Sequence, residues 1–141
     1  MASNNNNGPT QFHPLLAVGS IVWVKFPYTV GQPGPYARPA IVKEVSPAYH
    51  RVKLVFGTSQ KTENLYPTEF VVKKTDPDFL QTGLSYDTKF DVSRIANVPY
   101  DDEWFEIHSP RPGKPPFTSP IIGQLPASYI PAIQLAVSHV K

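Results

Sequence analysis

Basic side chains that could bind a polyanion gather in one part of the sequence, between Arg38 and Lys61. This stretch has five cations and one acid, whereas the stretch between Asp76 and Glu106 has eight acids and two cations. Such a separation of charge suits a polyanion at the first stretch and a cationic partner at the second. The net charge of +2 is too small to support this by itself. The alternative is that both stretches are ordinary solvated faces of strands and loops.

The sequence has no pattern typical of a metal site and no cysteine nucleophile. The chain has no cysteine, which excludes disulfides, thiolate metal sites and cysteine nucleophiles. Its four histidines lie far apart and show no spacing typical of metal ligands. We therefore expect neither a metal nor a cofactor.

The length of 141 residues and the hydrophobic content of 40% fit one folded domain. Four consecutive asparagines near the N-terminus favour a disordered tail over residues 1–13, followed by a single domain over residues 14–141. The longest apolar runs are far shorter than the ~18–20 residues that a membrane span needs. The N-terminus also lacks the pattern of a secretory signal. We expect a cytoplasmic protein with no membrane partner.

Alternating β-branched and aromatic residues predict several short strands. The first covers residues 21–26, and the others are expected at residues 39–45, 51–56, 69–72 and 88–95. Between the first two, residues 28–37 contain two glycines and two prolines, which predict a shaped loop. Strands at such short spacing are typical of a barrel or sandwich, so the predicted fold class is mainly β.

Two helices and one irregular segment are expected in the second half of the chain. Asp76 and the proline after it mark the start of a short helix that Gly83 ends. Residues 108–120 contain five prolines, which predict a loop or extended arm. Near the C-terminus, with Ser128 as its cap, a helix is expected to pack on the sheet. Its apolar stripe consists of Ile130, Ile133, Val137 and Val140.

Three segments occur in an order and at a spacing that match one known family. The first has a strand, a glycine-containing loop and an Arg-Pro pair, the second a strand that ends in Thr-Ser, and the third a Lys-Phe-Asp strand before the final helix. The first segment covers residues 19–26 and 31–42, and the second covers residues 53–60. The third combines residues 83–84, 89–95 and 122–125. Together they resemble the MazF/PemK-like toxin family of type II toxin–antitoxin systems, over most of the chain.

The resemblance implies an SH3-like barrel of the CcdB/PemK-like fold, with a short helix and a C-terminal helix packed on the sheet. It implies a toxin that cleaves single-stranded RNA as a metal-independent endoribonuclease. In that reaction the neighbouring 2′-hydroxyl attacks the phosphate and leaves a 2′,3′-cyclic phosphate. The resemblance also implies a homodimer and a cognate antitoxin protein that neutralises it.

By the same resemblance, Arg38 holds the phosphate charge, because a guanidinium meets phosphate oxygens through two charge-assisted hydrogen bonds. Thr58 hydrogen-bonds the scissile phosphate, and Asp91 stands at the position of a general base. These three are the expected catalytic residues. The expected substrate-binding residues are Gln32, Tyr36, Ser59, Gln60 and Lys89.

The chain departs from the family pattern in the loop that follows Gly31. Pro33 and Gly34 stand where many members have Glu-Gln, and Gln32 stands where some have an active-site histidine. Lys89 replaces a second arginine, which keeps the charge but loses the bidentate geometry. The alternative function is a catalytically silent barrel that binds a protein or nucleic acid.

The three expected catalytic residues also have structural explanations. Arg38 could be an exposed cation at a strand start, and Thr58 could be a turn former. Asp91 could bond to a backbone amide or pair with a neighbouring cation. Catalysis requires the three side chains to converge on one phosphate-sized cleft, whereas a binding module does not.

Overall fold

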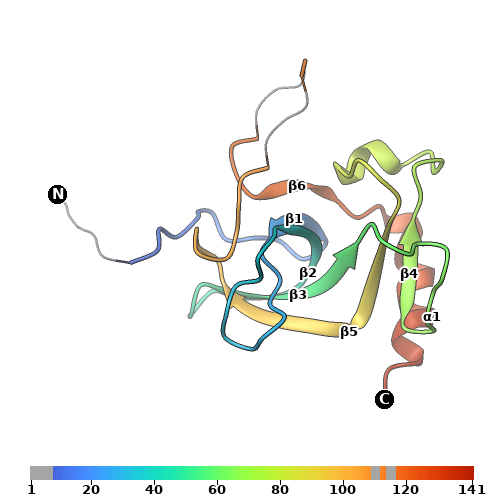
Figure 1. The fold of residues 1–141 in the computed structure, drawn as a ribbon, viewed down its shortest axis with the longest axis horizontal. Coiled ribbons are helices and arrows are strands. Elements are labelled where there is room, and N and C mark those ends of the chain that lie inside the picture. The colour runs from blue at the N-terminus through green and yellow to red at the C-terminus, as the bar shows by residue number, and fades with distance from the viewer. Residues whose placement is uncertain (1–7, 109–111, 114–116) are drawn as a thin grey trace.

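The computed structural model describes residues 8–108, 112–113 and 117–141. Six antiparallel strands form one sheet that curls into a half-barrel, and the chain ends in a short helix (Figure 1). The mainly β fold class is therefore confirmed. The strands are β1 Ser20–Val24, β2 Arg38–Ser46, β3 Arg51–Thr58, β4 Glu69–Val72, β5 Thr88–Pro99 and β6 Ile121–Gln124.

The strands follow the order β4-β5-β3-β2-β1-β6 across the sheet. Five of them lie where alternation predicts, while β6 is short, contains Gly123 and was not predicted as a strand. β1 ends two residues earlier than expected, because Lys25 then bonds to a loop: its backbone N–H donates to the carbonyl of Trp104 over 2.7 Å. β5 runs four residues beyond the predicted end at Ile95.

Both faces of the sheet bury apolar side chains, because neighbouring residues of a strand point to opposite faces. In β1, Val22 and Val24 face the inside of the curl, whereas Ile21 faces a second core. The first core is Leu16, Val22, Val24, Phe26, Ala40, Val42, Val52, Leu54, Phe56, Val98, Tyr100, Trp104 and Phe105. The second is Ile21, Ile41, Val55, Phe70, Val72, Phe79, Phe90, Ile122 and Tyr129.

The first core extends to residues near the N-terminus. The ring of Phe12 packs on that of Tyr100, with centroids 5.5 Å apart, and its N–H donates to the Tyr100 carbonyl over 3.1 Å. The N–H of Thr10 donates to Oδ1 of Asp102 over 2.8 Å. Residues 10–13 of the expected tail therefore belong to the folded domain, and residues 1–7 lie outside the described part of the chain.

The expected short helix is a single 3-10 turn, η1, over Phe79–Thr82. Asp76 forms a turn before it by accepting a 2.8 Å hydrogen bond from the backbone N–H of Asp78. Gly83 ends it in the left-handed region at φ 72°, as predicted. A Cβ at Gly83 would lie 1.8 Å from the carbonyl oxygen of Ile122, so only glycine allows η1 to approach β6 this closely.

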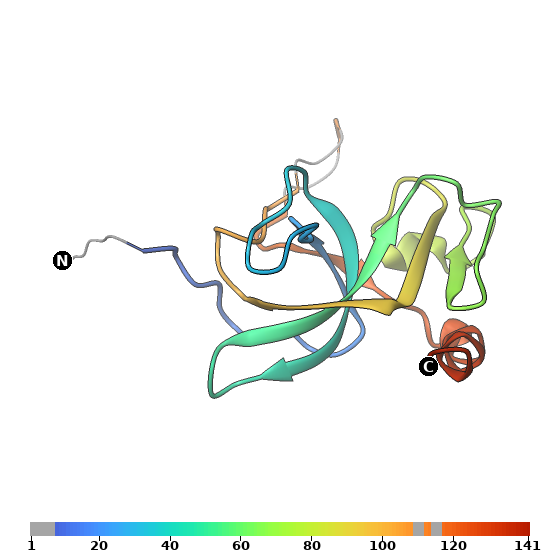
Figure 2. The same cartoon turned by 60° about the horizontal axis from the view of Figure 1, so that its bottom comes forward.

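The C-terminal helix, α1, covers Ile130–Ser138 after a 3-10 turn, η2, over Ala127–Tyr129. Figure 2 shows α1 end-on beside β4. The expected cap is wrong, since Ser128 Oγ instead donates to Asp78 Oδ2 over 3.3 Å. The expected stripe is also wrong except for Ile133, because only Ala132 and Ile133 of α1 pack on the second core. Ala136 is the buried residue of the helix. Ile130, Val137 and Val140 are exposed.

The proline-rich segment, residues 108–120, lies partly outside the described residues, which omit 109–111 and 114–116. Its described ends are attached to β1. The ring of His108 lies 4.4 Å from that of Trp23, and the Trp23 N–H donates to the Pro120 carbonyl over 2.9 Å. Within the described ranges, no helix is long and apolar enough to cross a membrane.

Candidate functional site

A pocket of about 350 Å³ opens where the ends of β2, β3, β4 and β5 meet. Its lining combines four cations with one carboxylate, one hydroxyl, one amide and one aromatic ring. These residues are Arg38, Phe56, Thr58, Gln60, Lys61, Glu69, Lys89 and Arg94. Such an excess of positive charge in a concave site favours an anionic ligand.

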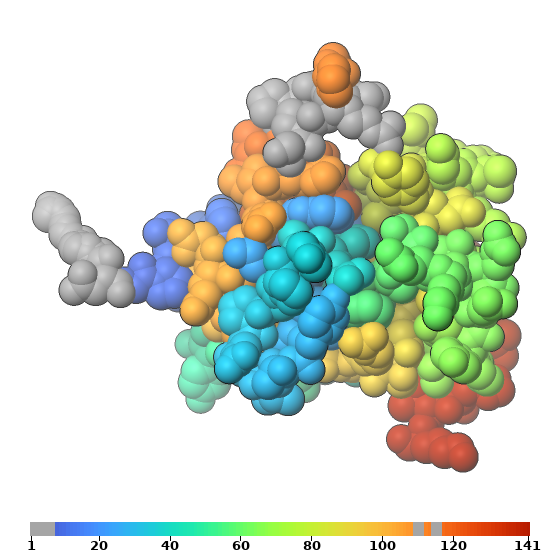
Figure 3. All heavy atoms as spheres, in the orientation of Figure 1, coloured from blue at the N-terminus to red at the C-terminus, as the bar shows by residue number. Residues whose placement is uncertain are grey.

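The strand register explains why these side chains meet. Thr58, the last residue of β3, pairs with Lys89 of β5, and Arg38 and Glu69 begin β2 and β4. Gly57 allows the close packing beneath them, because a Cβ there would lie 2.6 Å from the Phe90 ring and from the Pro39 carbonyl oxygen. Figure 3 shows the loop of residues 28–37 and the connection from β3 to β4 on the same face of the molecule.

Arg38 is oriented by an aromatic residue of that loop. Its Nε and Nη2 both donate to the hydroxyl of Tyr28, over 3.0 and 2.5 Å. The guanidinium also lies 5.6 Å from the Tyr28 ring centroid and 6.0 Å from that of Phe56. Two donors are thus occupied, and the remaining N–H groups have no acceptor among the described residues, so they can bind an anion.

Lys89 lies at the floor of the pocket in a buried ion pair. Its Nζ lies 3.3 Å from Glu69 Oε1, and the two side chains are 9% and 8% exposed. The ammonium also donates to the Asn64 carbonyl over 3.1 Å, and the same Glu69 oxygen accepts the Tyr66 N–H over 2.8 Å. This network fixes the position of the Lys89 charge.

Arg94 reaches the pocket through an irregularity in β5. Val55 pairs with Ile95, but the next residue, Phe56, pairs with Asp91, so residues 92–94 have no partner in β3. This bulge places the guanidinium carbon of Arg94 3.8 Å from the ring centroid of Phe56. A cation at this distance over an aromatic face is attracted by the ring quadrupole. The two arginines of the pocket therefore share contact with one ring.

Asp91, the expected general base, does not line the pocket. Its Oδ1 accepts hydrogen bonds from the Thr68 hydroxyl (2.9 Å), the Ser93 N–H (2.9 Å) and the Ser93 hydroxyl (2.6 Å). These bonds tie the bulge to the start of β4. In this structure Asp91 stabilises the segment that carries Arg94.

The other predicted residues divide between the lining and the surface. The pocket brings Arg38 and Thr58 together with Gln60 and Lys89. The Thr58 hydroxyl also accepts the Gln60 N–H over 3.2 Å, so Thr58 forms a turn as well. Gln32, Tyr36 and Ser59 are exposed and do not line it.

Sequence reasoning did not assign Lys61, Glu69 or Arg94 to the site. Lys61 lies in the basic stretch, and its backbone adopts φ 53° at the turn after β3. Glu69 had no visible signal, because its role depends on the pairing of β4 with β5. Arg94 depends on a bulge that alternation cannot reveal.

Shifted pKa values occur at the α1 side of the fold and in the first core. Burial raises the pKa of Tyr129 to about 12, and its hydroxyl donates to Asp76 Oδ2 over 2.7 Å. Burial also raises the pKa of Tyr100 to about 12. In the described part of the chain, no group of three or more His, Cys, Asp or Glu residues is arranged to hold a metal ion.

Among known proteins, no family model matches this chain and no curated protein matches it. Its function must therefore be inferred from the geometry and charge of the pocket.

Proposed function

We propose that this protein is a metal-independent endoribonuclease that cleaves single-stranded RNA in the pocket of Arg38, Thr58 and Lys89. The observation that carries the proposal is the lining, in which four cations and a hydroxyl surround a space of about 350 Å³. Guanidinium groups bind phosphate oxygens through charge-assisted hydrogen bonds. We therefore place a phosphodiester group of the RNA in this space.

RNA carries its own nucleophile, so the protein supplies only charge and proton transfer. The 2′-oxygen attacks the adjacent phosphorus while the bond from phosphorus to the 5′-oxygen breaks. The products are a 2′,3′-cyclic phosphate and a 5′-hydroxyl, because one proton leaves the 2′-hydroxyl and one reaches the 5′-oxygen. The phosphorane-like transition state has additional negative charge, which preorganised cations stabilise.

The sheet order supports a division of roles across the pocket. Glu69 on β4 and Arg38 on β2 are separated by β5 and β3, which carry Lys89 and Thr58. In-line attack places the proton acceptor and donor on opposite sides of phosphorus. Glu69 takes the acceptor role in place of Asp91, since its Oε2 has no hydrogen bond among the described residues. Arg38 contacts the leaving oxygen.

The test is cleavage of a long unstructured RNA in the presence of EDTA. The parent protein should leave 5′-hydroxyl and 2′,3′-cyclic phosphate ends, and a strand with deoxyribose at the scissile position should stay intact. Arg38→Ala should lower the rate about 100- to 1000-fold, the usual effect of removing one group that stabilises transition-state charge.

Arg51→Ala provides a matched control on the same sheet. Arg51 bonds to Asn97 over 3.1 and 2.9 Å and does not line the pocket, so this variant should cleave like the parent. The proposal is wrong if the parent leaves RNA intact with and without chelator, or if Arg38→Ala cleaves as fast as Arg51→Ala.

A second candidate function is binding of single-stranded nucleic acid without cleavage. It is favoured by Asp91, whose carboxylate is engaged in the bulge, and by residues 31–37, which contain no acid and no histidine. Binding by the three pocket cations without a carboxylate partner among the described residues, Arg38, Lys61 and Arg94, would give a slope of about −2 for log affinity against log salt, since each neutralised phosphate contributes about −0.7. Salt-dependent binding with no cleavage products would support this function.

The cellular role proposed with the ribonuclease rests on the sequence resemblance. It is that of a cytoplasmic toxin with a homodimeric CcdB/PemK-like barrel and a cognate antitoxin. An acidic antitoxin segment would compete with RNA for the cations of the pocket. Light scattering tests the dimer. A neighbouring gene for a small DNA-binding protein with an acidic tail would support the antitoxin.

A further inference from the structure

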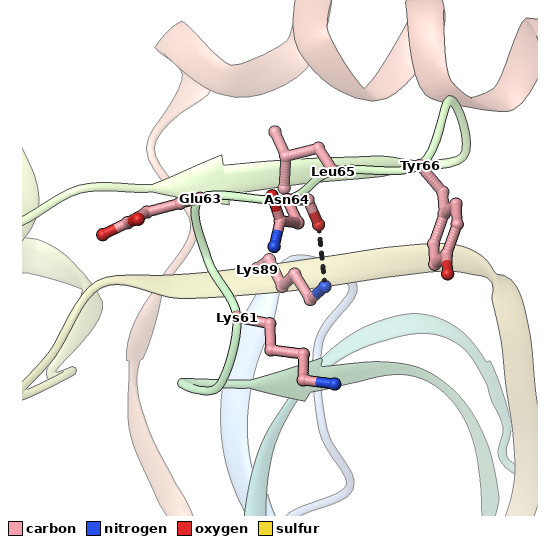
Figure 4. A pocket seen from close by; sticks show the side chains of 6 residues that line it. All are labelled: Lys61, Glu63, Asn64, Leu65, Tyr66 and Lys89. Atoms are coloured by element: carbon pink, nitrogen blue, oxygen red, sulfur yellow. Dashed lines mark hydrogen bonds between the residues drawn. The ribbon is translucent and has the colours of Figure 1, made fainter.

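A second cavity opens beside the proposed cleavage pocket and has a volume of about 550 Å³. It is formed by the connection from β3 to β4 and by one residue of β5 (Figure 4). Its lining residues are Lys61, Glu63, Asn64, Leu65, Tyr66 and Lys89. Because Lys61 and Lys89 line both cavities, a ligand held by its phosphate in the first can extend into the second.

We infer that this second cavity binds a nucleobase, stacked on the ring of Tyr66, next to the phosphate held in the first cavity. The inference rests on the proposed function for the identity of the strand. It adds a recognition site that the cleavage chemistry does not require.

Tyr66 has the properties of a stacking surface. The residue is 73% exposed, while its backbone is fixed by the 2.8 Å hydrogen bond from its N–H to Glu69. In Figure 4 the Tyr66 side chain lies at the right of the cavity, with Lys89 and Lys61 to its left. The carboxylate that holds the Lys89 ammonium thus also holds the backbone of Tyr66.

Asn64 and Lys61 supply polar groups for the edge of the base. The Asn64 backbone is occupied, because its carbonyl accepts from Lys89 over 3.1 Å and its N–H donates to the Lys61 carbonyl over 3.1 Å. Its side-chain amide and the Lys61 ammonium have no partner among the described residues. The Lys61 ammonium only donates, so it favours bases with a carbonyl oxygen, which guanine, uracil and cytosine have and adenine lacks. The Asn64 amide both donates and accepts, so it can bond to the edge of any base.

The test is calorimetric titration of the full chain with 3′-GMP, 3′-AMP and inorganic phosphate. The parent should bind 3′-GMP about 10-fold more tightly than phosphate, because stacking on an aromatic ring strengthens binding by this order per base. Tyr66→Ala should remove this gain and leave phosphate binding unchanged. Tyr66→Phe, which keeps the ring, should retain it. Tyr49→Ala, which removes a tyrosine of similar exposure (77%) outside both cavities, should bind like the parent.

The inference is overturned if 3′-GMP binds no tighter than phosphate, or if Tyr66→Ala binds 3′-GMP like Tyr49→Ala. Its failure can be told apart from failure of the ribonuclease proposal. Nucleotide binding that depends on Tyr66 in a protein that leaves RNA intact supports the base site and contradicts cleavage. Efficient cleavage with nucleotide binding that ignores Tyr66 contradicts the base site alone.

Discussion

The ion pair of Lys89 and Glu69 should couple the stability of the fold to the charge of the pocket. Glu69→Gln keeps the shape of the side chain and still accepts the Tyr66 N–H, but it leaves the ammonium opposite a neutral amide. Because only 9% of the Lys89 side chain is exposed, water replaces the lost carboxylate only in part. The variant therefore isolates the cost of one uncompensated buried charge.

Removing one partner of a buried ion pair costs about 3–5 kcal/mol, against a total stability of about 5–15 kcal/mol for a domain. Lys89→Met should cost a similar amount, because it leaves the Glu69 carboxylate unpaired. The double variant removes both charges and should fall within about 1–2 kcal/mol of the parent, since uncharged replacements of a buried pair are often close to neutral. The two single effects should thus be far from additive.

Urea unfolding followed by tryptophan fluorescence measures these differences, since the chain has two tryptophans, Trp23 and the buried Trp104. Phosphate titration of the same proteins separates stability from function. The double variant should fold well but bind phosphate more weakly than the parent, because it has lost the Lys89 ammonium as a hydrogen-bond donor. A loss below about 1 kcal/mol for Glu69→Gln, or additive single effects, would show that the pair is solvated and refute this reasoning.

Three further outcomes test other parts of the structure. Gly57→Ala should destabilise the fold by about 1–3 kcal/mol in urea unfolding, since the added methyl group overpacks the strands beneath the pocket; unchanged stability would contradict the close packing. Asp91→Ala should release Arg94 and weaken phosphate binding and cleavage, whereas Asp91→Asn should restore most of both; loss of cleavage in both variants would instead identify a general base. The pKa values of Tyr100 and Tyr129, each raised to about 12, mean that folding favours the neutral phenols. Their contribution to stability is complete below about pH 10 and should be lost between about pH 10 and 12, so phenolate absorbance should show two of the seven tyrosines ionising last.

Most of the strands could be predicted because alternation follows directly from the pleat of a sheet. The end of the short helix could be predicted at Gly83, because the left-handed backbone conformation that ends a helix is favoured by glycine itself. The cap at Ser128 could not be excluded locally, because that hydroxyl is drawn to Asp78 in a distant turn. β6 is only four residues long and contains a glycine, which weakens any strand signal.

Site residues at the ends of predicted strands could be found from the sequence. Residues that enter the site only because distant strands pair could not. Arg38, Thr58 and Lys89 were placed by resemblance, and ordinary strand ends bring them together. Glu69 enters only because β4 pairs with β5. The orientation of Asp91 depends on hydrogen bonds to Ser93 and the start of β4, which no local pattern specifies.

The bulge in β5 also inverts the phase of that strand. It inserts three residues, an odd number. Before the bulge the even-numbered Phe90 faces the second core, whereas after it the even-numbered Ala96 and Val98 face the first core. Deleting one residue between Asp91 and Ile95 would therefore turn Val98 toward the opposite face. The length of this insertion therefore constrains the fold more strictly than the identity of its residues. Residues must be added or removed two at a time if Ala96 and Val98 are to keep facing the first core.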